Sequence, residues 1–323
     1  MAVEQQVRAP QPQPEQQEPR QADPTLLSLS GRDYLAIARR SFSEFREDNL
    51  TTVAAALAYY AFLAIPSVLM VALGIFGLVS DPAGVSALVD RLSGVMPSDA
   101  RRLLQESLTR ITTDKGTGVV ILIVGCALAL WSLTGAMQNV IWGLNIAYER
   151  DETRGFVRKR VTGLTMVVFA GGAVLLVFAL LVLGPHMVKW IGDAVGQESL
   201  VSWIWWTAQW PILLAGLLVA FAGILYLGPN VDHPRWSFLS FGAVLAIVLF
   251  LVLSGAFAFY ASRFGSYNKT WGSLSAVVVM LTWLWLSSVA LLFGAEVNAE
   301  AERSRELRRS EPAEVELQAP PKA

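Results

Sequence analysis

Residues 48–79, DNLTTVAAALAYYAFLAIPSVLMVALGIFGLV, decide the fold class of this chain. After a polar start, the run from Val53 to Val79 contains no charged residue. At about 1.5 Å of rise per residue, a helix over this run is longer than the roughly 30 Å hydrocarbon core of a bilayer. The stretch therefore predicts a membrane-spanning helix that tilts, kinks or extends beyond that core.

Pro66 predicts a kink in this first span, because a proline leaves the carbonyl of Phe62 without its helical N–H donor. Lipid cannot supply that donor, so we expect this face to pack against other helices or to meet water. Tyr59 and Tyr60 add two hydroxyl groups within the span, and two interpretations of them stay open. They either bond to neighbouring helices in a packed bundle or line a cavity.

The composition of the whole chain also indicates a membrane protein. Of its 323 residues, 54% are hydrophobic and 16% are charged, whereas about a quarter of the residues of a soluble protein are charged. Six stretches long enough to span a bilayer contain no Asp, Glu, Lys, Arg or His; they cover residues 53–79, 119–141, 161–183, 203–227, 238–259 and 274–295. The sequence therefore predicts an all-α, polytopic membrane protein with six transmembrane helices.

The distribution of Lys and Arg predicts how these spans are oriented. Six spans place both termini on the same side of the membrane. Cations close to span ends gather on that side, within residues 32–46, 150–160 and 303–309. Because loops rich in Lys and Arg stay in the cytoplasm, we expect both termini to be cytoplasmic.

Segments outside the spans complete the predicted organisation, in which residues 31–302 form the membrane domain. Residues 1–30 are rich in Gln, Pro and Glu and are predicted to be a disordered tail. Residues 303–323 are predicted to be a charged tail. Between the first two spans, apolar residues at helical spacing before and after Pro97 predict an outer pair of amphipathic helices.

One further amphipathic helix is predicted before the first span, over residues 32–46. Tyr34, Ala38, Phe42 and Phe45 recur at helical spacing and would share its apolar face, opposite charged residues. Such a helix either lies on the inner membrane surface or is a solvated juxtamembrane helix. The sequence leaves both interpretations open.

Polar side chains gather at the inner ends of the first, second and sixth spans. They are Asp48, Asn49, Gln138, Asn139, Asn145, Glu296 and Asn298. Their convergence would make a polar vestibule open to the cytoplasmic side. Glu296 is the carboxylate nearest the hydrocarbon, and we expect Asn49 or Asn145 to donate hydrogen bonds to it. The competing interpretation is that these side chains cap helices and join the bundle without binding a ligand.

The short loop after the second span is basic and ends in three consecutive cations, Arg158, Lys159 and Arg160. Cations at a membrane surface attract anionic lipid headgroups, each by about 1 kcal/mol. The three residues are therefore candidate headgroup contacts at the rim of the vestibule. Membrane topology alone is a sufficient alternative explanation for them.

Metal-dependent hydrolysis of RNA is disfavoured by the residues available. Such an enzyme needs His, Asp or Glu ligands that converge on a metal. The chain has two histidines, His186 and His233, which the predicted topology places on opposite sides of the membrane. The single cysteine, Cys126, falls within the second span and allows no intrachain disulfide. We therefore predict no catalytic residue, no metal, no cofactor and no nucleic-acid partner.

Several motifs together resemble those of the YihY/BrkB family of bacterial inner-membrane proteins. They are AAALAYY with the following proline in residues 54–66, WGSL in 271–274, WLWLS in 283–287 and GAEVNAE in 294–300. Trp131-Ser132 and Leu144-Asn145 fit the same pattern, and the resemblance covers about Phe42 to Glu302. Ile65 departs from the phenylalanine that precedes this proline in the family. The resemblance implies six spans in the inner membrane.

The same resemblance implies less about activity, because family members carry the labels ribonuclease BN and virulence factor, and envelope transport has been suggested for relatives. Together with the polar vestibule, it leads to the hypothesis of a non-enzymatic protein that transports or handles a lipid or another amphiphile. Membrane lipids would be its partners, and an envelope protein or a second copy stays open. The competing hypothesis is a structural or partner-binding protein. A lipid-sized groove would favour transport, and a filled bundle with all polar groups paired would favour the scaffold.

Overall fold

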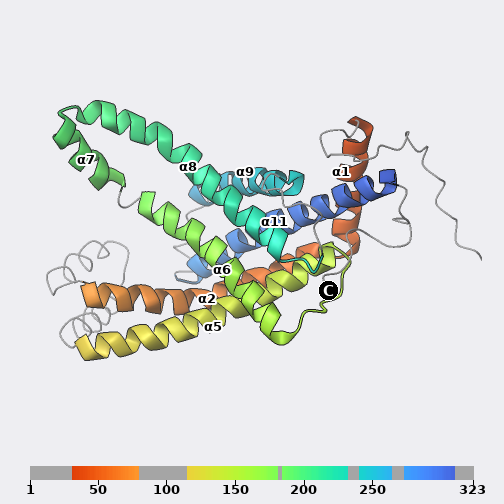
Figure 1. The fold of residues 1–323 in the computed structure, drawn as a ribbon, viewed down its shortest axis with the longest axis horizontal. Coiled ribbons are helices and arrows are strands. Elements are labelled where there is room, and N and C mark those ends of the chain that lie inside the picture. The colour runs from red at the N-terminus through yellow and green to blue at the C-terminus, as the bar shows by residue number, and fades with distance from the viewer. Residues whose placement is uncertain (1–30, 80–114, 181–183, 232–239, 264–272, 310–323) are drawn as a thin grey trace, which may run out of the picture.

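The computed structural model describes residues 31–79, 115–180, 184–231, 240–263 and 273–309. These residues fold into helices, which confirms the predicted all-α class. The elements are α1 (Gly31–Glu47), α2 (Leu50–Val79), α5 (Lys115–Ala147), α6 (Phe156–Phe178), α7 (Gly184–Val195), α8 (Glu198–Leu227), α9 (Phe241–Arg263) and α11 (Ser273–Arg309) (Figure 1). The predicted outer helical pair and both predicted tails up to residue 30 and after residue 309 lie outside the described residues.

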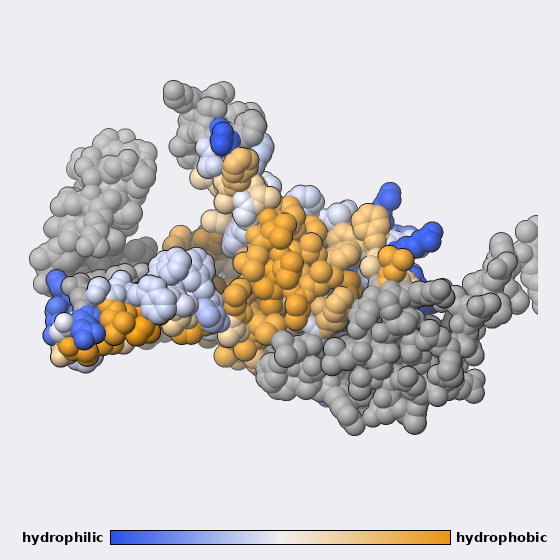
Figure 2. All heavy atoms as spheres, turned by 90° about the horizontal axis from the view of Figure 1, so that it is seen from above, coloured by the Kyte–Doolittle hydropathy of each residue, from blue (hydrophilic) through white to orange (hydrophobic). Residues whose placement is uncertain are grey.

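Six of these helices are long and apolar enough to cross a membrane, as predicted. The candidate spans are Leu50–Leu69, Ile123–Ala147, Phe156–Val177, Ser199–Leu227, Phe241–Arg263 and Ser275–Arg303. A broad hydrophobic surface crosses the middle of the molecule, with hydrophilic residues towards its ends (Figure 2). This distribution fits a protein whose middle is surrounded by lipid.

Two helix boundaries differ from the prediction. α6 begins at Phe156, so Arg158, Lys159 and Arg160 lie in its first turns rather than in a loop. The predicted outer loop after the third span contains a separate helix, α7. α2 continues as one helix through Pro66, whose ring is exposed.

The helices are tightly packed along only part of their length. The buried core is built mainly from one part of each of five helices, which Phe45 of α1 and Met166 of α6 join: 50–58 of α2, 141–148 of α5, 220–231 at the end of α8, 242–247 of α9 and 290–301 of α11. We call this region the packed half. The remaining parts of the same helices, 59–69, 119–131, 199–219, 248–263 and 275–289, have mostly exposed or half-buried side chains and form the splayed half.

The arrangement of the ribbons explains this difference. α2 lies beside α5, α6 pairs with α8, and α9 pairs with α11. In Figure 1 the α6–α8 pair approaches the α2–α5 pair near the packed half and diverges from it towards the other end. Small residues allow the close approach in the packed half: Ala54, Ala58, Ala243, Ala246 and Ala290 are all buried.

α1 packs across α11 beside the packed half, but with a different face from the one predicted. Ile37, Ser41 and Phe45 are its buried stripe, whereas Ala38 and Phe42 are exposed. Ile37 packs against α11 in a small cluster with Val297 and Ala301. The exposure of Ala38 and Phe42 leaves both interpretations of the predicted apolar face open, and the buried Ser41 is small enough to let α1 approach α11 closely.

Candidate functional site

The predicted vestibule residues all lie at or near the packed half, but they belong to separate contacts. Asn145 joins a network around Arg154, Asn298 binds the start of α9, and Gln138 and Asn139 bind backbone groups nearby. The structure therefore brings these side chains to one region of the bundle without placing them around one pocket that the described residues form.

Arg154 is the centre of the largest polar network, in the link between α5 and α6. Its side chain is only 2% exposed, and its Nε and Nη2 donate to the two carboxylate oxygens of Glu152 at 2.8 Å each. Nη1 donates to the carbonyl of Leu227 at 3.1 Å, and Nη2 donates to that of Gly228 at 2.7 Å. The guanidinium group thus satisfies two backbone carbonyls at the end of α8, which have no helical donor of their own.

Asn145 and Asn230 extend this network between helices. Asn145 Nδ2 donates to Glu152 at 3.0 Å, and its Oδ1 accepts the backbone N–H of Asn230 at 2.8 Å. Asn230 Nδ2 in turn donates to the carbonyl of Asp151 and to the hydroxyl of Thr153. The end of α5, the following link and the end of α8 are therefore held together by buried hydrogen bonds.

Glu152 shows how strongly Arg154 acts in this network. Burial alone would raise the pKa of the Glu152 carboxyl, because it disfavours the charged form. The hydrogen bonds and charge of Arg154, with the hydrogen bond from Asn145, instead lower that pKa below its ordinary value. Glu152 is thus held ionised and paired, which is the state that a structural ion pair requires.

Asn298 forms a second polar contact, between α11 and α9. Its Oδ1 accepts the backbone N–H of Gly242 at 2.7 Å, and its Nδ2 donates to Ser240 Oγ at 3.1 Å. Tyr148 is fully buried next to Asn298, and burial together with the nearby Glu302 and Glu296 raises its pKa well above the ordinary value. Asn298 therefore supplies an acceptor to the N–H of Gly242, which has no partner within α9 at the start of that helix.

Glu296 differs from these paired residues. It is 3% exposed, and its Oε2 has no hydrogen-bond partner among the described residues. The predicted donors do not reach it, because Asn49 Nδ2 bonds to the carbonyl of Glu47 and Asn145 belongs to the Arg154 network. That expectation was wrong, since two closer acceptors compete for the amides.

Further carboxylates surround Glu296 at this end of the bundle, namely Asp48, Glu300, Glu44 and Glu149. Burial raises the pKa of Asp48, Glu44 and Glu149, and repulsion from neighbouring carboxylates, such as Glu47 beside Asp48 and Asp48 beside Glu149, raises it further. Glu300 pairs with two cations, Arg40 Nε at 2.6 Å and Arg303 Nη1 at 3.3 Å. Among the residues that the structure describes, no group of three or more His, Cys, Asp or Glu could hold a metal ion.

The other predicted residues have individual roles. Gln138 Nε2 donates to the carbonyl of Lys159 at 3.0 Å and so joins α5 to α6, whereas Asn139 bonds within its own helix to Gly135. The Arg160 guanidinium stacks on Trp131, 4.8 Å from the ring centroid, and lies near Phe156. Tyr59 and Tyr60 are exposed on α2 and contact each other edge to face at 5.5 Å.

Sequence reasoning missed the structural role of Glu152, Arg154 and Asn230. Their segment was read as a basic loop and a turn, and two acceptors of Arg154 are backbone carbonyls without any sequence signature. The one available signal was the Glu-x-Arg pair itself, an acid and a base on a loop that connects two spans.

Comparison with known proteins gives consistent matches over most of the chain. The family described as virulence factor BrkB matches residues 41–318. The ribonuclease-like protein YfkH of Bacillus subtilis is 27% identical over 84% of this chain and 98% of its own length. A UPF0761 membrane protein of Xanthomonas axonopodis pv. citri is 29% identical over 81% of this chain, which spans 60% of that relative. A UPF0761 membrane protein of Azoarcus sp. is 28% identical over 87% of this chain and 66% of its own length. No solved structure matches.

Proposed function

The chain belongs to the virulence factor BrkB family, and from that premise we propose that it handles or transports a lipid or another amphiphile in the membrane. We propose further that it does so without catalysing a reaction and without a cofactor. The name of the Bacillus subtilis relative describes that protein as ribonuclease-like. Two isolated histidines offer little support for such chemistry here.

The observation that carries the proposal is that side-chain burial stops part-way along the spanning helices. Gly135 of α5, Gly172 of α6 and Gly255 of α9 each have open space where a Cβ would stand. Membrane helices gain stability from close packing of their backbones, so a bundle that served only as a support would be expected to pack along its whole length. The exposed apolar side chains of these helices are accessible to the acyl chains of an amphiphile.

Polar groups beside this apolar surface would suit the head of such a molecule. Arg160 is held on Trp131 at the α5–α6 crossing, and Arg158 and Lys159 lie in the same turns of α6. Two tyrosine hydroxyls, of Tyr59 and Tyr60, are exposed on α2 and have no hydrogen-bond partner among the described residues. The packed half would then be the fixed support of the site, where Glu296 Oε2 is a buried acceptor without a hydrogen-bond partner among the described residues.

Native mass spectrometry of the purified full-length chain tests this function. We expect a lipid to remain bound at a fixed stoichiometry after extensive detergent exchange. Gly135→Phe and Gly172→Phe fill the open positions and should each reduce its occupancy several-fold, whereas Val157→Phe, at an exposed position at the start of α6, should not. Absence of a retained lipid, or equal occupancy in all variants, would contradict the proposal.

A structural or partner-binding role is the second candidate, because most predicted vestibule amides are paired with protein groups. Gln138, Asn145 and Asn298 all bond across helices, as expected of residues that only hold a bundle together. If this role is the right one, Glu296→Gln should change function only as far as it changes the melting temperature. A functional defect with an unchanged melting temperature would instead favour a ligand at Glu296.

We also propose that the protein resides in the bacterial inner membrane with both termini in the cytoplasm, from the positions of its cations. Single cysteines in a Cys126→Ser background test this orientation in intact cells. A cysteine at Gln197 should react with an impermeant maleimide, and one at Thr153 should not. Labelling at Thr153 alone would reverse the orientation and place the packed half on the outer side.

A further inference from the structure

α1 has two faces with different surroundings. Ile37, Ser41 and Phe45 are buried against the rest of the bundle, and the Arg40–Glu300 ion pair fixes the helix to α11. The opposite side carries Leu35, Arg39, Phe42 and Arg46 at positions i, i+4, i+7 and i+11, which lie on one stripe of a helix. All four are exposed, Leu35 by 72% and Phe42 by 57%. We call these four residues the outer stripe.

The placement of α1 brings the outer stripe close to the membrane surface. α1 ends at Glu47 and the first candidate span begins at Leu50, so the short connection cannot carry α1 far from the bilayer. In Figure 1, α1 lies roughly at right angles to α2 and α5. Because those helices cross the membrane, α1 runs along the surface rather than away from it.

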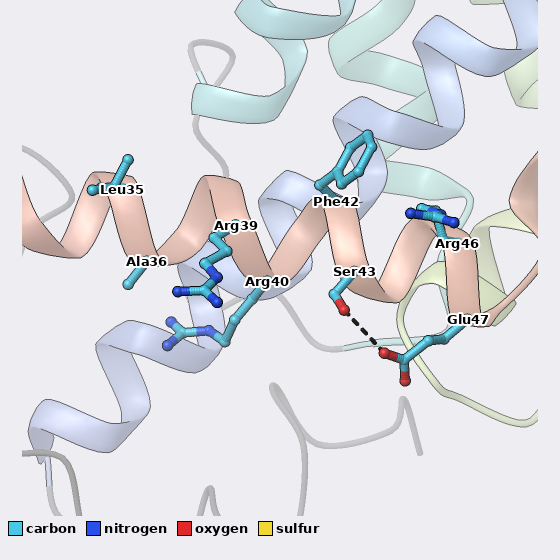
Figure 3. A pocket seen from close by; sticks show the side chains of 8 residues that line it. All are labelled: Leu35, Ala36, Arg39, Arg40, Phe42, Ser43, Arg46 and Glu47. Atoms are coloured by element: carbon cyan, nitrogen blue, oxygen red, sulfur yellow. Dashed lines mark hydrogen bonds between the residues drawn. The ribbon is translucent and has the colours of Figure 1, made fainter.

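A hollow of about 930 Å³ lies along this side of α1. The described residues that line it all belong to α1 and include the whole outer stripe together with Arg40. Figure 3 shows the Phe42 ring and the guanidinium groups of Arg39 and Arg40 pointing to different sides of the helix. Apolar and cationic side chains of α1 therefore both line the hollow, and Glu47 adds a carboxylate at its end.

We propose that the outer stripe of α1 binds the headgroups of anionic phospholipids in the leaflet beside the packed half. Arg39 and Arg46 would contact the lipid phosphates, while Leu35 and Phe42 would enter the boundary between headgroups and acyl chains. This site is distinct from the splayed half, and it stands or falls independently of the proposed function.

The charges of α1 favour an anionic phospholipid as the ligand of the outer stripe. Arg39 and Arg46 have no ion pair with any described residue, and Arg46 lies over the Phe42 ring, 6.0 Å from its centroid. Two unneutralised arginines that alternate with exposed apolar residues are the pattern of helices that lie in an anionic membrane interface. The bilayer is also already present around the adjoining spans, so no further partner has to be recruited.

Lipid titration followed by native mass spectrometry measures this binding. The delipidated full-length protein is titrated with phosphatidylglycerol or phosphatidylcholine, with inorganic phosphate as a competitor. We expect preference for phosphatidylglycerol, and an approximately thirtyfold loss of that affinity in Arg39→Gln/Arg46→Gln, since each interfacial cation contributes about fivefold. The matched control Lys189→Gln/Arg263→Gln, which removes two exposed cations elsewhere, should leave the affinity unchanged.

Equal binding of the two lipids, or equal losses in the two double variants, would overturn the proposal. Efficient competition by inorganic phosphate would also overturn it, because a free anion would then be the ligand. A second measurement uses Phe42→Cys and Ser43→Cys in a Cys126→Ser background. In liposomes with phosphatidylglycerol, a water-soluble maleimide should label Phe42→Cys several-fold more slowly than Ser43→Cys. Equal labelling rates would show a solvated helix and contradict membrane docking.

Discussion

The packed half and the splayed half belong to the same helices and have similar apolar composition, but they bury their side chains very differently. Ala54, Ile141 and Ala290 are fully enclosed, whereas Trp131, Val252 and Val278 are exposed by more than half. Hydrophobicity therefore does not decide where this bundle packs. The difference follows from a higher share of glycine and alanine in the packed half and from the polar contacts of Asn145, Arg154 and Asn298 there.

Glycines show the contrast most directly, because the residue type is constant. A Cβ on Gly294 would stand 2.5 Å from the Ala246 Cβ and 2.6 Å from the Gly242 carbonyl. A Cβ on Gly255 would meet nothing within 4 Å. The first glycine is required by the approach of α9 to α11, and the second is not required by any described contact.

The largest expected effect comes from Arg154 in the packed half. Arg154→Leu removes the partner of Glu152 and both donors to the end of α8, so we expect a loss of about 3–5 kcal/mol in the free energy of unfolding. Arg158→Leu removes an exposed cation four residues further along the chain and should lower the free energy of unfolding by less than about 1 kcal/mol. Unfolding in mixed detergent micelles measures both. Similar losses in the two variants would mean that the Arg154 network does not hold the packed half.

The next effect distinguishes the two glycines. Gly294→Ala forces α9 and α11 apart and should cost about 1–3 kcal/mol, as overpacking of a close contact does. Gly255→Ala should be neutral or slightly stabilising, because alanine favours a helix by up to about 1 kcal/mol over glycine. Thermal unfolding in detergent compares them. If the two substitutions cost the same, the splayed half is packed in solution and the contrast is lost.

Asn298 and Asn139 provide the next comparison, in which the expected change in stability is smaller. Asn298→Ala leaves the N–H of Gly242 without its acceptor and should cost about 1–3 kcal/mol. Asn139→Ala loses a hydrogen bond within its own helix and should lower the free energy of unfolding by only a few tenths of that amount. Melting temperatures would rank the variants. A larger loss for Asn139 would place the critical polar contact on α5 instead of α11.

pH should have the smallest effect and should act through the acidic cluster. Glu44, Asp48 and Glu149 have raised pKa values when folded, so their contribution to stability is present at low pH and is lost as pH rises through those values. The melting temperature should therefore increase from pH 7.5 to about 5. Below about pH 4 it should fall, because Glu152 has a lowered pKa and loses its ion pair on protonation.

A matched substitution locates this dependence. Glu149→Gln removes one of the three repelling carboxylates and should reduce the gain in melting temperature between pH 7.5 and 5. Asp193→Asn changes an exposed carboxylate on α7 and should leave the gain as it is. If the melting temperature of Glu149→Gln changed with pH as that of the original protein does, repulsion between carboxylates at the packed half would not explain the pH dependence.

The six spans were predictable because a helix in lipid must be long and free of charge, and both properties can be read from the sequence. The gathering of polar residues at one end was predictable for the same reason. Their partners were not. Arg154 bonds to carbonyls at Leu227 and Gly228, and such backbone acceptors have no residue type that reveals them. The buried face of α1 was not predicted, because the small Ser41 contributes nothing to an apolar pattern.

The difference between the two halves is tested most directly by the accessibility of nitroxide labels to dissolved oxygen in liposomes. Labels are attached to single cysteines in a Cys126→Ser background, at Val252 and Gly255 of the splayed half and at Ala58 and Ala290 of the packed half. We predict high oxygen collision rates at the first two positions and rates several-fold lower at the last two. Equally low rates at all four positions would contradict the account, because the splayed half would then be as closed as the packed half.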